Sequence, residues 1–175
     1  GWFFMQGLLH VYTGAGKGKT TAAVGLAVRM RGAGMPVVFA QFLKGTPTSE
    51  LAPLQVIGVR IFRRKSVEKF VGAMTPEERT ACRSEQCACF AQAVAAAPEE
   101  GLLVLDELCG ALALNMLDTA AVRTFLKDRP AGLEVACTGR DAPGWLLEQA
   151  DYVTIMACKK HPYTRGIRAR KGIEY

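Results

Sequence analysis

A glycine-rich segment near the amino terminus, TGAGKGKTT at residues 13–21, combines the residue types that bind a phosphate chain. Glycines let backbone N–H groups close around phosphate oxygens, and a helix that follows presents its N-terminus to the same negative charge. We expect Lys19 to reach the terminal phosphates and the Thr20 hydroxyl to bind Mg²⁺. The usual spacing has a glycine where this chain has Thr13, so the standard pattern is met only in its second half. The segment predicts a site for the phosphates of ATP, with a chance glycine-rich turn as the alternative.

Two acidic residues, Asp106 and Glu107, directly follow an apolar run. A hard cation between phosphates and Thr20 favours carboxylate ligands, so this pair is the expected second half of a magnesium site. An ordinary acidic pair in a surface loop is the alternative interpretation. We therefore predict that Thr20, Asp106 and Glu107 bind Mg²⁺.

Two arginines are candidates for holding further phosphate oxygens, because a guanidinium group matches such oxygens in a fork. Arg140 follows a predicted strand, whereas Arg29 lies well along the first predicted helix, where an ion pair on the helix surface is a serious alternative. No lid or acceptor motif is evident. These residues indicate ATP and Mg²⁺ without indicating what is done with them.

The elements that must position these residues alternate between strand and helix patterns. The predicted strands are 8–13, 36–42, 59–62, 102–106, 133–138 and 152–157. The predicted helices are 19–31, 76–97, one from the cap Asp118 to Lys127, and 142–150. Thr75 and Glu78 form a predicted capping box at the start of the second helix. The segment before residue 59 is rich in Gly, Pro, Ser and Thr and is expected to be a loop. This order predicts an α/β fold in which helices cover a parallel sheet whose strands are apolar on both faces.

The most reactive residue types fall at the predicted carboxyl ends of the strands, where ligands bind in sheets of this kind. They are the loop after Thr13, Gln41, the acidic pair at 106–107, and the segment Thr138–Arg140. We expect a single domain spanning residues 8–175. Residues 1–7 are interpreted as a leader or a cloning remnant.

The charge of the chain is unevenly distributed. From Lys159 to Tyr175 there are six basic residues and one acidic residue, so this tail carries +5 of the net charge of +6. A basic excess confined to a short tail favours contact with a compact polyanion at least as well as contact with a nucleic acid. A solvated tail without a partner is the third interpretation.

The six cysteines and the apolar runs indicate the compartment. We expect Cys109, Cys137 and Cys158 to be buried small hydrophobic residues, and the spacing of Cys87 and Cys89 on a helix disfavours a shared metal. No apolar run approaches the length of about 20 residues that spans a bilayer. Without a secretory signal, we expect a cytoplasmic protein with reduced thiols and no membrane partner.

The motifs together resemble the P-loop corrinoid adenosyltransferases of cobalamin biosynthesis and salvage, from about Leu8 to the final residue. The matching stretches are 14–23 with Gly25 and Arg29, QFLKG at 41–45, VLDEL at 104–108, TGR at 138–140, Ala150-Asp151, and 160–175 with Lys160-His161-Pro162, Gly166 and KGIEY. The shifted glycine spacing around Thr13 is this family's own form.

The resemblance implies a three-layer, RecA-like P-loop NTPase fold, a homodimer, and an unusual use of ATP. A reduced Co(I) corrinoid, such as cob(I)alamin, attacks the 5′ carbon of ATP, and triphosphate leaves. No protein nucleophile is then required. The resemblance assigns catalysis to Lys19, Thr20 and Glu107, and metal binding to Thr20, Asp106 and Glu107. It assigns corrinoid binding to Gln41, Phe42 and Phe70. The residues that it assigns to ATP binding are Gly14, Ala15, Gly16, Lys17, Gly18, Lys19, Thr20, Thr21, Arg29, Arg140 and His161. An electron donor such as a flavoprotein is the implied partner, and a nucleic acid is not.

The chain also departs from the family pattern. Many members have an amino-terminal helix that folds over the partner's active site, and this chain starts almost at its first predicted strand. Many have a Phe-x-Trp pair at the corrinoid's lower face, where this chain offers Phe70 and no tryptophan, and Ala15 replaces a frequent asparagine. We interpret His161 as a packing or hydrogen-bonding residue rather than a cobalt ligand.

Two other functions remain open from the residues alone. One is a P-loop kinase or ATPase that acts on another small molecule. The other is a nucleotide-dependent protein whose basic tail contacts nucleic acid. The natural corrinoid, the choice between biosynthesis and salvage, and the identity of the reductant are not indicated by the sequence.

Overall fold

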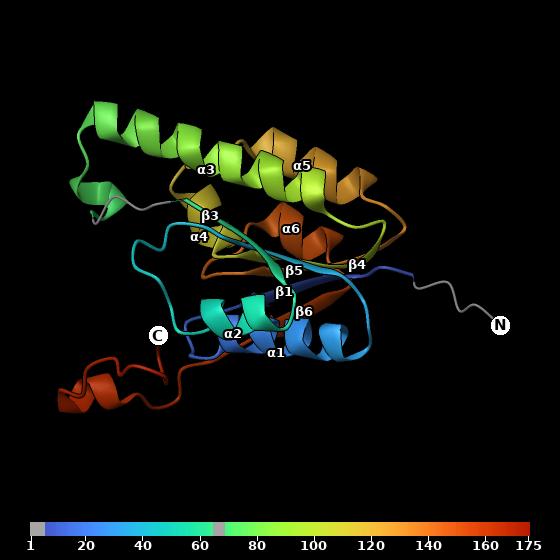
Figure 1. Cartoon of the computed structure of the whole chain (residues 1–175). Coiled ribbons are helices and arrows are strands. Elements are labelled where there is room, and N and C mark those ends of the chain that lie inside the picture. Colours follow the sequence, from blue (N-terminus) through green and yellow to red (C-terminus); the bar gives the residue numbers. More distant parts are fainter. Residues whose placement is uncertain (1–5, 65–68) are drawn as a thin grey trace.

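A six-stranded, all-parallel sheet forms the centre of the protein, as the sequence predicted (Figure 1). The computed structural model describes residues 6–64 and 69–175, so residues 1–5 of the predicted leader lie outside the described part. The strands are β1 (Leu9–Thr13), β2 (Val37–Gln41), β3 (Arg60–Arg63), β4 (Glu100–Asp106), β5 (Gly132–Thr138) and β6 (Tyr152–Ile155). They lie in the order β3-β2-β4-β5-β1-β6. This arrangement is consistent with a P-loop NTPase fold.

Helices cover both faces of the sheet and complete the three layers (Figure 1). The helices are α1 (Lys19–Gly32), α2 (Leu51–Val56), α3 (Pro76–Ala96), α4 (Leu108–Ala113), α5 (Thr119–Asp128) and α6 (Gly144–Gln149), with two 3₁₀ turns, η1 (Val71–Ala73) and η2 (Pro162–Arg165). One face carries α3, α4, α5 and α6, and the opposite face carries α1 and α2. Among the described residues, none of the helices has both the length and the apolar character that a membrane span requires.

The central strand β4 shows why the sheet needs both helical layers. Leu103 and Leu105 pack into the core beneath α3–α6, while Leu102 and Val104 pack into the core beside α1 and α2. All four side chains are fully buried. Because successive side chains of a strand point to opposite faces, a strand buried on both sides reads as one continuous apolar run.

Two helix starts follow the capping chemistry of the sequence. The Thr75 hydroxyl accepts a hydrogen bond from the backbone N–H of Glu78 at 3.2 Å, and the Glu78 carboxylate accepts one from the N–H of Thr75 at 3.3 Å. Asp118 accepts bonds from the N–H groups of Ala120 and Ala121. Both predicted caps are confirmed, because each depends only on residues within one turn.

Three expectations about local structure were wrong. The segment before β3, expected to be a loop, contains α2, whose Pro53 lies in the first turn, where a helix makes no use of the missing N–H. The last strand, β6, is not apolar on both faces of a covered sheet, since it lies at the edge with all four residues exposed. Cys158, expected to be buried, is exposed just beyond that edge.

The buried cysteines behave as small apolar residues. Cys89, Cys109 and Cys137 are buried, as expected for Cys109 and Cys137. Burial raises the pKa of the Cys89 thiol to about 11 and that of Cys109 to about 12. These thiols therefore stay protonated and pack as hydrophobic groups near neutral pH.

The packed structure begins earlier than residue 8. Gly7, placed by sequence in the leader, is buried, and its N–H donates a hydrogen bond to the carbonyl of Ala131 at 2.7 Å. Its carbonyl accepts a bond from Arg129 at 3.2 Å. Gly7 is thus part of the folded unit, at the amino end of β1.

Candidate functional site

The glycine-rich segment forms a tight loop between the end of β1 and the start of α1. Thr13, at the position where the usual pattern has its first glycine, is the last residue of β1 and is paired with Ile155 of β6. The loop therefore begins one residue later, at Gly14. Gly14 and Gly18 have φ angles of 105° and 108°, a conformation that side chains with a Cβ rarely adopt. Gly18 is the N-cap of α1, so the helix directs its amino end into the loop. The local geometry is that of an anion cradle.

Gly16 is required for a different reason, which is space. Its N–H donates a hydrogen bond to the Met156 carbonyl at 2.6 Å. A Cβ on Gly16 would lie 2.5 Å from that carbonyl oxygen and 2.7 Å from its carbon. The loop therefore packs directly on the chain that leaves β6, and only glycine fits.

We expect Gly16→Ala to lower the free energy of unfolding by about 1–3 kcal/mol, because backbone on both sides must move to admit the methyl group. Urea denaturation measures this change. The matched control is Gly25→Ala in α1, where no heavy atom lies within 4 Å of the added Cβ. That control should gain about 0.5–1 kcal/mol. Equal stabilities of the two variants would contradict the packing argument.

The side chain of Lys19 folds back onto its own loop. Its ammonium donates hydrogen bonds to the carbonyl oxygens of Gly14 at 2.8 Å and Gly16 at 2.7 Å. Burial, followed by the nearby charge of Arg140, lowers the pKa of Lys19, while Glu107 acts in the opposite direction. The ammonium thus lies at the centre of the phosphate loop, where it can contact an anion bound by the loop.

Asp106 is the centre of a hydrogen-bond network that joins four segments. It is fully buried. Its Oδ1 accepts bonds from the hydroxyls of Thr20 at 2.8 Å and Thr138 at 2.7 Å. Its Oδ2 accepts bonds from Gln41 at 3.2 Å and from the ammonium of Lys44 at 3.2 Å. The carboxyl ends of β2, β4 and β5 and the start of α1 therefore meet at one carboxylate.

Glu107 lies beside this network in an unusual backbone conformation. Its φ is 62°, and it is the N-cap of α4. Its N–H donates to the Thr138 hydroxyl at 2.9 Å, the same hydroxyl that donates to Asp106. Burial, and then the charge of Asp106, raises the pKa of Glu107, whereas Lys44, Lys19 and Arg140 act to lower it. Glu107 is held in a position that disfavours its own charge, which is a pattern typical of functional carboxylates.

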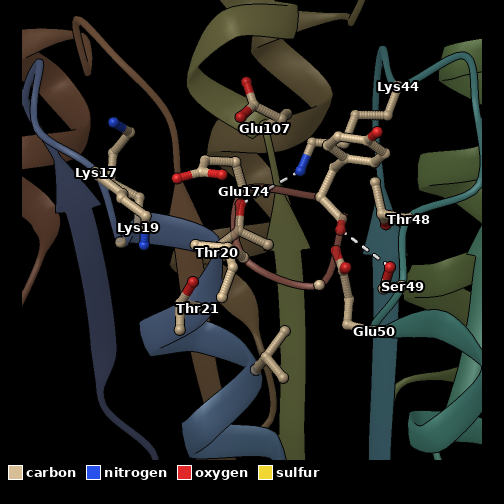
Figure 2. Close-up of a pocket in the computed structure, with 15 residues that line it drawn as sticks. Lys17, Lys19, Thr20, Thr21, Lys44, Thr48, Ser49, Glu50, Glu107 and Glu174 are labelled. Carbon is tan, nitrogen blue, oxygen red and sulfur yellow. Dashed lines mark hydrogen bonds between the residues drawn. The ribbon is translucent and has the colours of Figure 1, made fainter. Parts of the chain in front are cut away.

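A first cavity of about 510 Å³ opens over the phosphate loop (Figure 2). It is lined by residues 17–21, Val24, Lys44, Thr48–Glu50, Glu107 and Gly172–Tyr175. The chain's last residues reach it because the tail turns back toward the segment before α2 (Figure 1), where the Ser49 hydroxyl donates to the Tyr175 carbonyl at 2.9 Å. Figure 2 shows Lys44, Thr20 and Glu107 directed toward the same space, with Glu174 close to them.

A second, less polar cavity of about 760 Å³ adjoins the first. It is lined by residues 43–46 after β2, residues 69–71 and Met74 around η1, one face of α3 (Ala81, Cys82, Glu85, Gln86), Glu107 and Leu114. Phe70 lines this cavity with 89% of its surface exposed. Lys44 and Glu107 line both cavities, so these two side chains stand at the boundary between them.

The oxygen atoms near Thr20 fit a magnesium ion. Mg²⁺ prefers hard oxygen ligands and keeps several waters. The Thr20 hydroxyl and the Glu107 carboxylate supply such oxygens in the wall of the first cavity, and the buried carboxylate of Asp106 lies 2.8 Å behind the Thr20 hydroxyl. The buried Oε1 of Gln41, whose amide nitrogen bonds Asp106, has no hydrogen-bond partner among the described residues. A metal-bound water is the kind of donor that this oxygen lacks.

Several residues selected from the sequence lie elsewhere. Phe42 is fully buried in the core beneath α3–α6, below the surface of either cavity. Arg29 is exposed on α1, where its charge acts on Tyr12. Arg140 is exposed and lines neither cavity, although its charge acts on Lys19 and Glu107. His161 caps η2 by accepting a bond from the Tyr163 N–H at 3.0 Å.

The structure also brings in Lys44 and residues 48–50, to which the sequence analysis gave no role, and it shows which part of the tail reaches the site. Lys44 contacts Asp106 and Thr20, and residues 48–50 and 172–175 line the first cavity. The position of Lys44 three residues after Gln41, within a matching stretch, was the available signal. For the tail, the available signal was the match of residues 160–175, with KGIEY at their end, to the family pattern.

Nearly the whole chain is similar to members of one enzyme family. The model of a family described as ATP:corrinoid adenosyltransferase BtuR/CobO/CobP matches residues 5–175. A corrinoid adenosyltransferase of Pseudomonas aeruginosa is 36% identical over 171 residues, which cover 97% of this chain and 84% of the relative. The corrinoid adenosyltransferase CobA of Salmonella typhimurium is 35% identical over 176 residues, and one of Escherichia coli K12 is 34% identical over 171, each covering 97% of this chain and 86% of the relative.

Proposed function

Because the chain belongs to the ATP:corrinoid adenosyltransferase family, and so transfers the adenosyl group of ATP to a corrinoid in cobalamin biosynthesis, we propose which of its residues perform each part of the transfer. The triphosphate occupies the first cavity, with its phosphates in the loop at residues 14–21. The corrinoid occupies the second cavity. The reaction takes place at the boundary formed by Lys44 and Glu107.

The observation that carries this assignment is the sharing of two side chains by both cavities. In the transfer, a Co(I) corrinoid supplies the electron pair for a new bond between cobalt and the 5′ carbon, and the bond from that carbon to the triphosphate oxygen breaks. The two substrates must therefore meet at one point. Adjoining cavities with a common wall supply such a point, and an oriented encounter contributes roughly 7–11 kcal/mol to lowering the barrier.

The residues of the first cavity act mainly on the leaving group. Negative charge develops on the departing triphosphate, and fixed positive groups in a water-poor site stabilise it strongly. The backbone N–H groups of the loop and the ammonium of Lys19 are the groups so placed. Thr20, Asp106 and Glu107 would hold Mg²⁺, which supplies further positive charge to the phosphates when bound.

Phe70 is proposed to contact the corrinoid, because it exposes an aromatic ring in the second cavity. We expect Phe70→Ala to raise KM for the corrinoid on the order of 10-fold, the effect of losing one apolar contact in a binding pocket. KM for ATP should change little, and so should stability, since the ring is not in the core. Steady-state kinetics with each substrate varied in turn makes the measurement. An equal rise in both KM values would contradict the assignment.

The decisive experiment follows the products. With ATP, Mg²⁺ and chemically reduced cob(I)alamin, we expect an adenosylated corrinoid and intact triphosphate in equal amounts. Absorbance spectra measure the first, and anion-exchange chromatography measures the second. Release of phosphate or ADP without alkylation of cobalt would instead favour a P-loop kinase or ATPase. Salt-sensitive binding of DNA or RNA would favour the nucleic-acid alternative.

The cellular setting is proposed from the family resemblance. The cobalt must be reduced before transfer, and a flavoprotein is the electron donor we propose. We propose also that the protein is a cytoplasmic homodimer. The position of residues 172–175 in the wall of the first cavity supports the proposal that the tail closes over the nucleotide. The basic residues of the tail line neither cavity, and the charged residue among these four is Glu174.

A further inference from the structure

Lys44 places its ammonium between the side chains that would hold the metal. The nitrogen lies 3.2 Å from Oδ2 of Asp106 and 3.4 Å from the Thr20 hydroxyl oxygen (Figure 2 shows the Lys44–Thr20 contact). Its charge also acts on Glu107, whose pKa it lowers against the larger effects of burial and Asp106. The ammonium of Lys44 thus contacts Thr20 and Asp106 and acts through its charge on Glu107, the three residues of the proposed metal site.

The burial of Asp106 explains why a cation is needed at this point. The side chain of Asp106 has no exposed surface, whereas that of Lys44 is 28% exposed. A buried carboxylate without a compensating charge is strongly unfavourable. Thr20, Gln41 and Thr138 are neutral, so among the described partners of Asp106 the ammonium of Lys44 is the one that carries positive charge.

We propose that Lys44 is a built-in substitute for the metal: its ammonium holds Asp106 and Thr20 while no nucleotide is bound, and it must give way when Mg²⁺ enters with ATP. This inference rests on the proposed function, because it takes Thr20, Asp106 and Glu107 to be the metal site. Two cations cannot share the space between Asp106 and Thr20 without strong repulsion. The metal therefore cannot bind while the ion pair between Lys44 and Asp106 is in place.

The position of Lys44 allows this exchange. Lys44 lies in the connection after β2, outside any helix or strand, and its stem is long and flexible. It lines the second cavity as well as the first. After release from Asp106, the ammonium of Lys44 can move to the boundary of the two cavities, where the proposed reaction takes place. Exchange of the two cations would keep the metal site closed to free metal and make it available to metal that arrives with ATP.

The test measures binding of Mn²⁺ alone, as a spectroscopic substitute for Mg²⁺, to the nucleotide-free protein by electron paramagnetic resonance. Lys44→Met keeps the aliphatic stem and removes the charge. We expect this variant to bind Mn²⁺ at least about tenfold more tightly than the unaltered chain, because the competing cation is gone. Mn²⁺ should also raise the melting temperature of Lys44→Met, while leaving that of the unaltered chain nearly constant.

Two further variants make the result specific. Lys69→Met removes another lysine, which lines the second cavity and pairs with Glu78 rather than with Asp106, and it should bind Mn²⁺ as the unaltered chain does. If Lys44→Met folds poorly, Lys44→Gln gives the same test, since its amide keeps a hydrogen-bond donor for Asp106 without the charge. Equal gains in affinity from Lys69→Met and Lys44→Met would reduce the effect to general electrostatics and overturn the inference.

The inference and the proposed function fail in different ways. Unchanged Mn²⁺ affinity in both Lys44 variants would overturn the role of Lys44, even if the unaltered chain transfers adenosine normally with Mg²⁺. Full transfer activity of the unaltered chain in the presence of a metal chelator would instead overturn the metal part of the proposed function. Tight Mn²⁺ binding by the Lys44 variants supports the inference, whatever the rate of transfer.

Discussion

Replacing Lys19 with alanine is expected to lower kcat/KM for adenosyl transfer by about 10²–10³-fold, the effect of removing one fixed donor that stabilises developing charge. The ammonium lies in the centre of the phosphate loop, where it bonds two carbonyl oxygens of the loop itself. With ATP bound, the same group faces the triphosphate, whose charge grows as the bond to the adenosine carbon breaks. The loss should therefore appear in kcat as well as in KM.

The matched control for Lys19 is its neighbour Lys17. Lys17→Ala removes a lysine of the same loop, but Lys17 is exposed, whereas Lys19 is partly buried within the loop. We expect a much smaller change for Lys17→Ala, because an exposed charge is screened by solvent. Circular dichroism should show that both variants are folded. A Lys19→Ala enzyme with the unaltered rate would remove the phosphate loop from the mechanism.

Replacing Glu107 with glutamine is expected to reduce transfer by about 10²–10³-fold at low Mg²⁺, because the boundary of the two cavities loses a charged metal ligand. A higher concentration of Mg²⁺ should restore part of the rate. Initial rates across a series of Mg²⁺ concentrations measure both effects. Glu50→Gln is the control, since Glu50 also carries a carboxylate in the first cavity but lies near the tail.

The same substitution is expected to stabilise the nucleotide-free protein. Burial and the charge of Asp106 raise the pKa of Glu107 in the folded state, so the ionised form costs folding free energy. A group with a raised folded pKa is fully tolerated below its unfolded pKa and costs stability as the pH rises through the folded value. Glu107→Gln should thus unfold at a higher temperature than the unaltered chain at pH 7.

The pH dependence distinguishes this explanation from a packing effect. The advantage of Glu107→Gln should shrink as the pH falls toward the ordinary glutamate range, where the unaltered carboxyl is protonated in both states. Melting temperatures of the two proteins across this range, without nucleotide or metal, provide the measurement. A constant difference at all pH values would indicate packing. Gained stability with lost transfer would identify Glu107 as a residue retained for function.

Much of the fold followed from short stretches of sequence. The apolar runs predicted all six strands. For β2 and β4 the physical reason is burial on both faces, which favours apolar residues throughout, whereas the edge strands β3 and β6 have no fully buried residue. The capping residues Thr75 and Asp118 predicted two helix starts within one turn. The short helix α2 was missed because Pro53 and the neighbouring Gly, Ser and Thr residues are typical of a loop, and the short helix α4 was not predicted either.

The candidate site was predicted only in part, because some of its residues lie in one short segment and others meet only in the folded chain. The phosphate loop was identified because its glycines and its lysines lie in one continuous segment of the chain. Asp106 and Glu107 were both assigned to the metal, and Glu107 also to catalysis. The structure makes Asp106 the buried centre of the network and places Glu107 at the boundary of the cavities. That difference depends on the direction of each side chain at the end of β4, which composition does not encode.

The sequence by itself determined the phosphate loop, the strand ends and the family, because each rests on residue types at fixed spacing along the chain. Tertiary structure alone decided that Lys44 pairs with Asp106, which residues of the tail line the first cavity, and that Phe42 lies in the core. These facts depend on strand order and on the path of loops between elements. The contact between Lys44 and Asp106 joins residues 62 positions apart, across the neighbouring strands β2 and β4. No local pattern fixes such a distance, since it is set by the packing of the whole sheet.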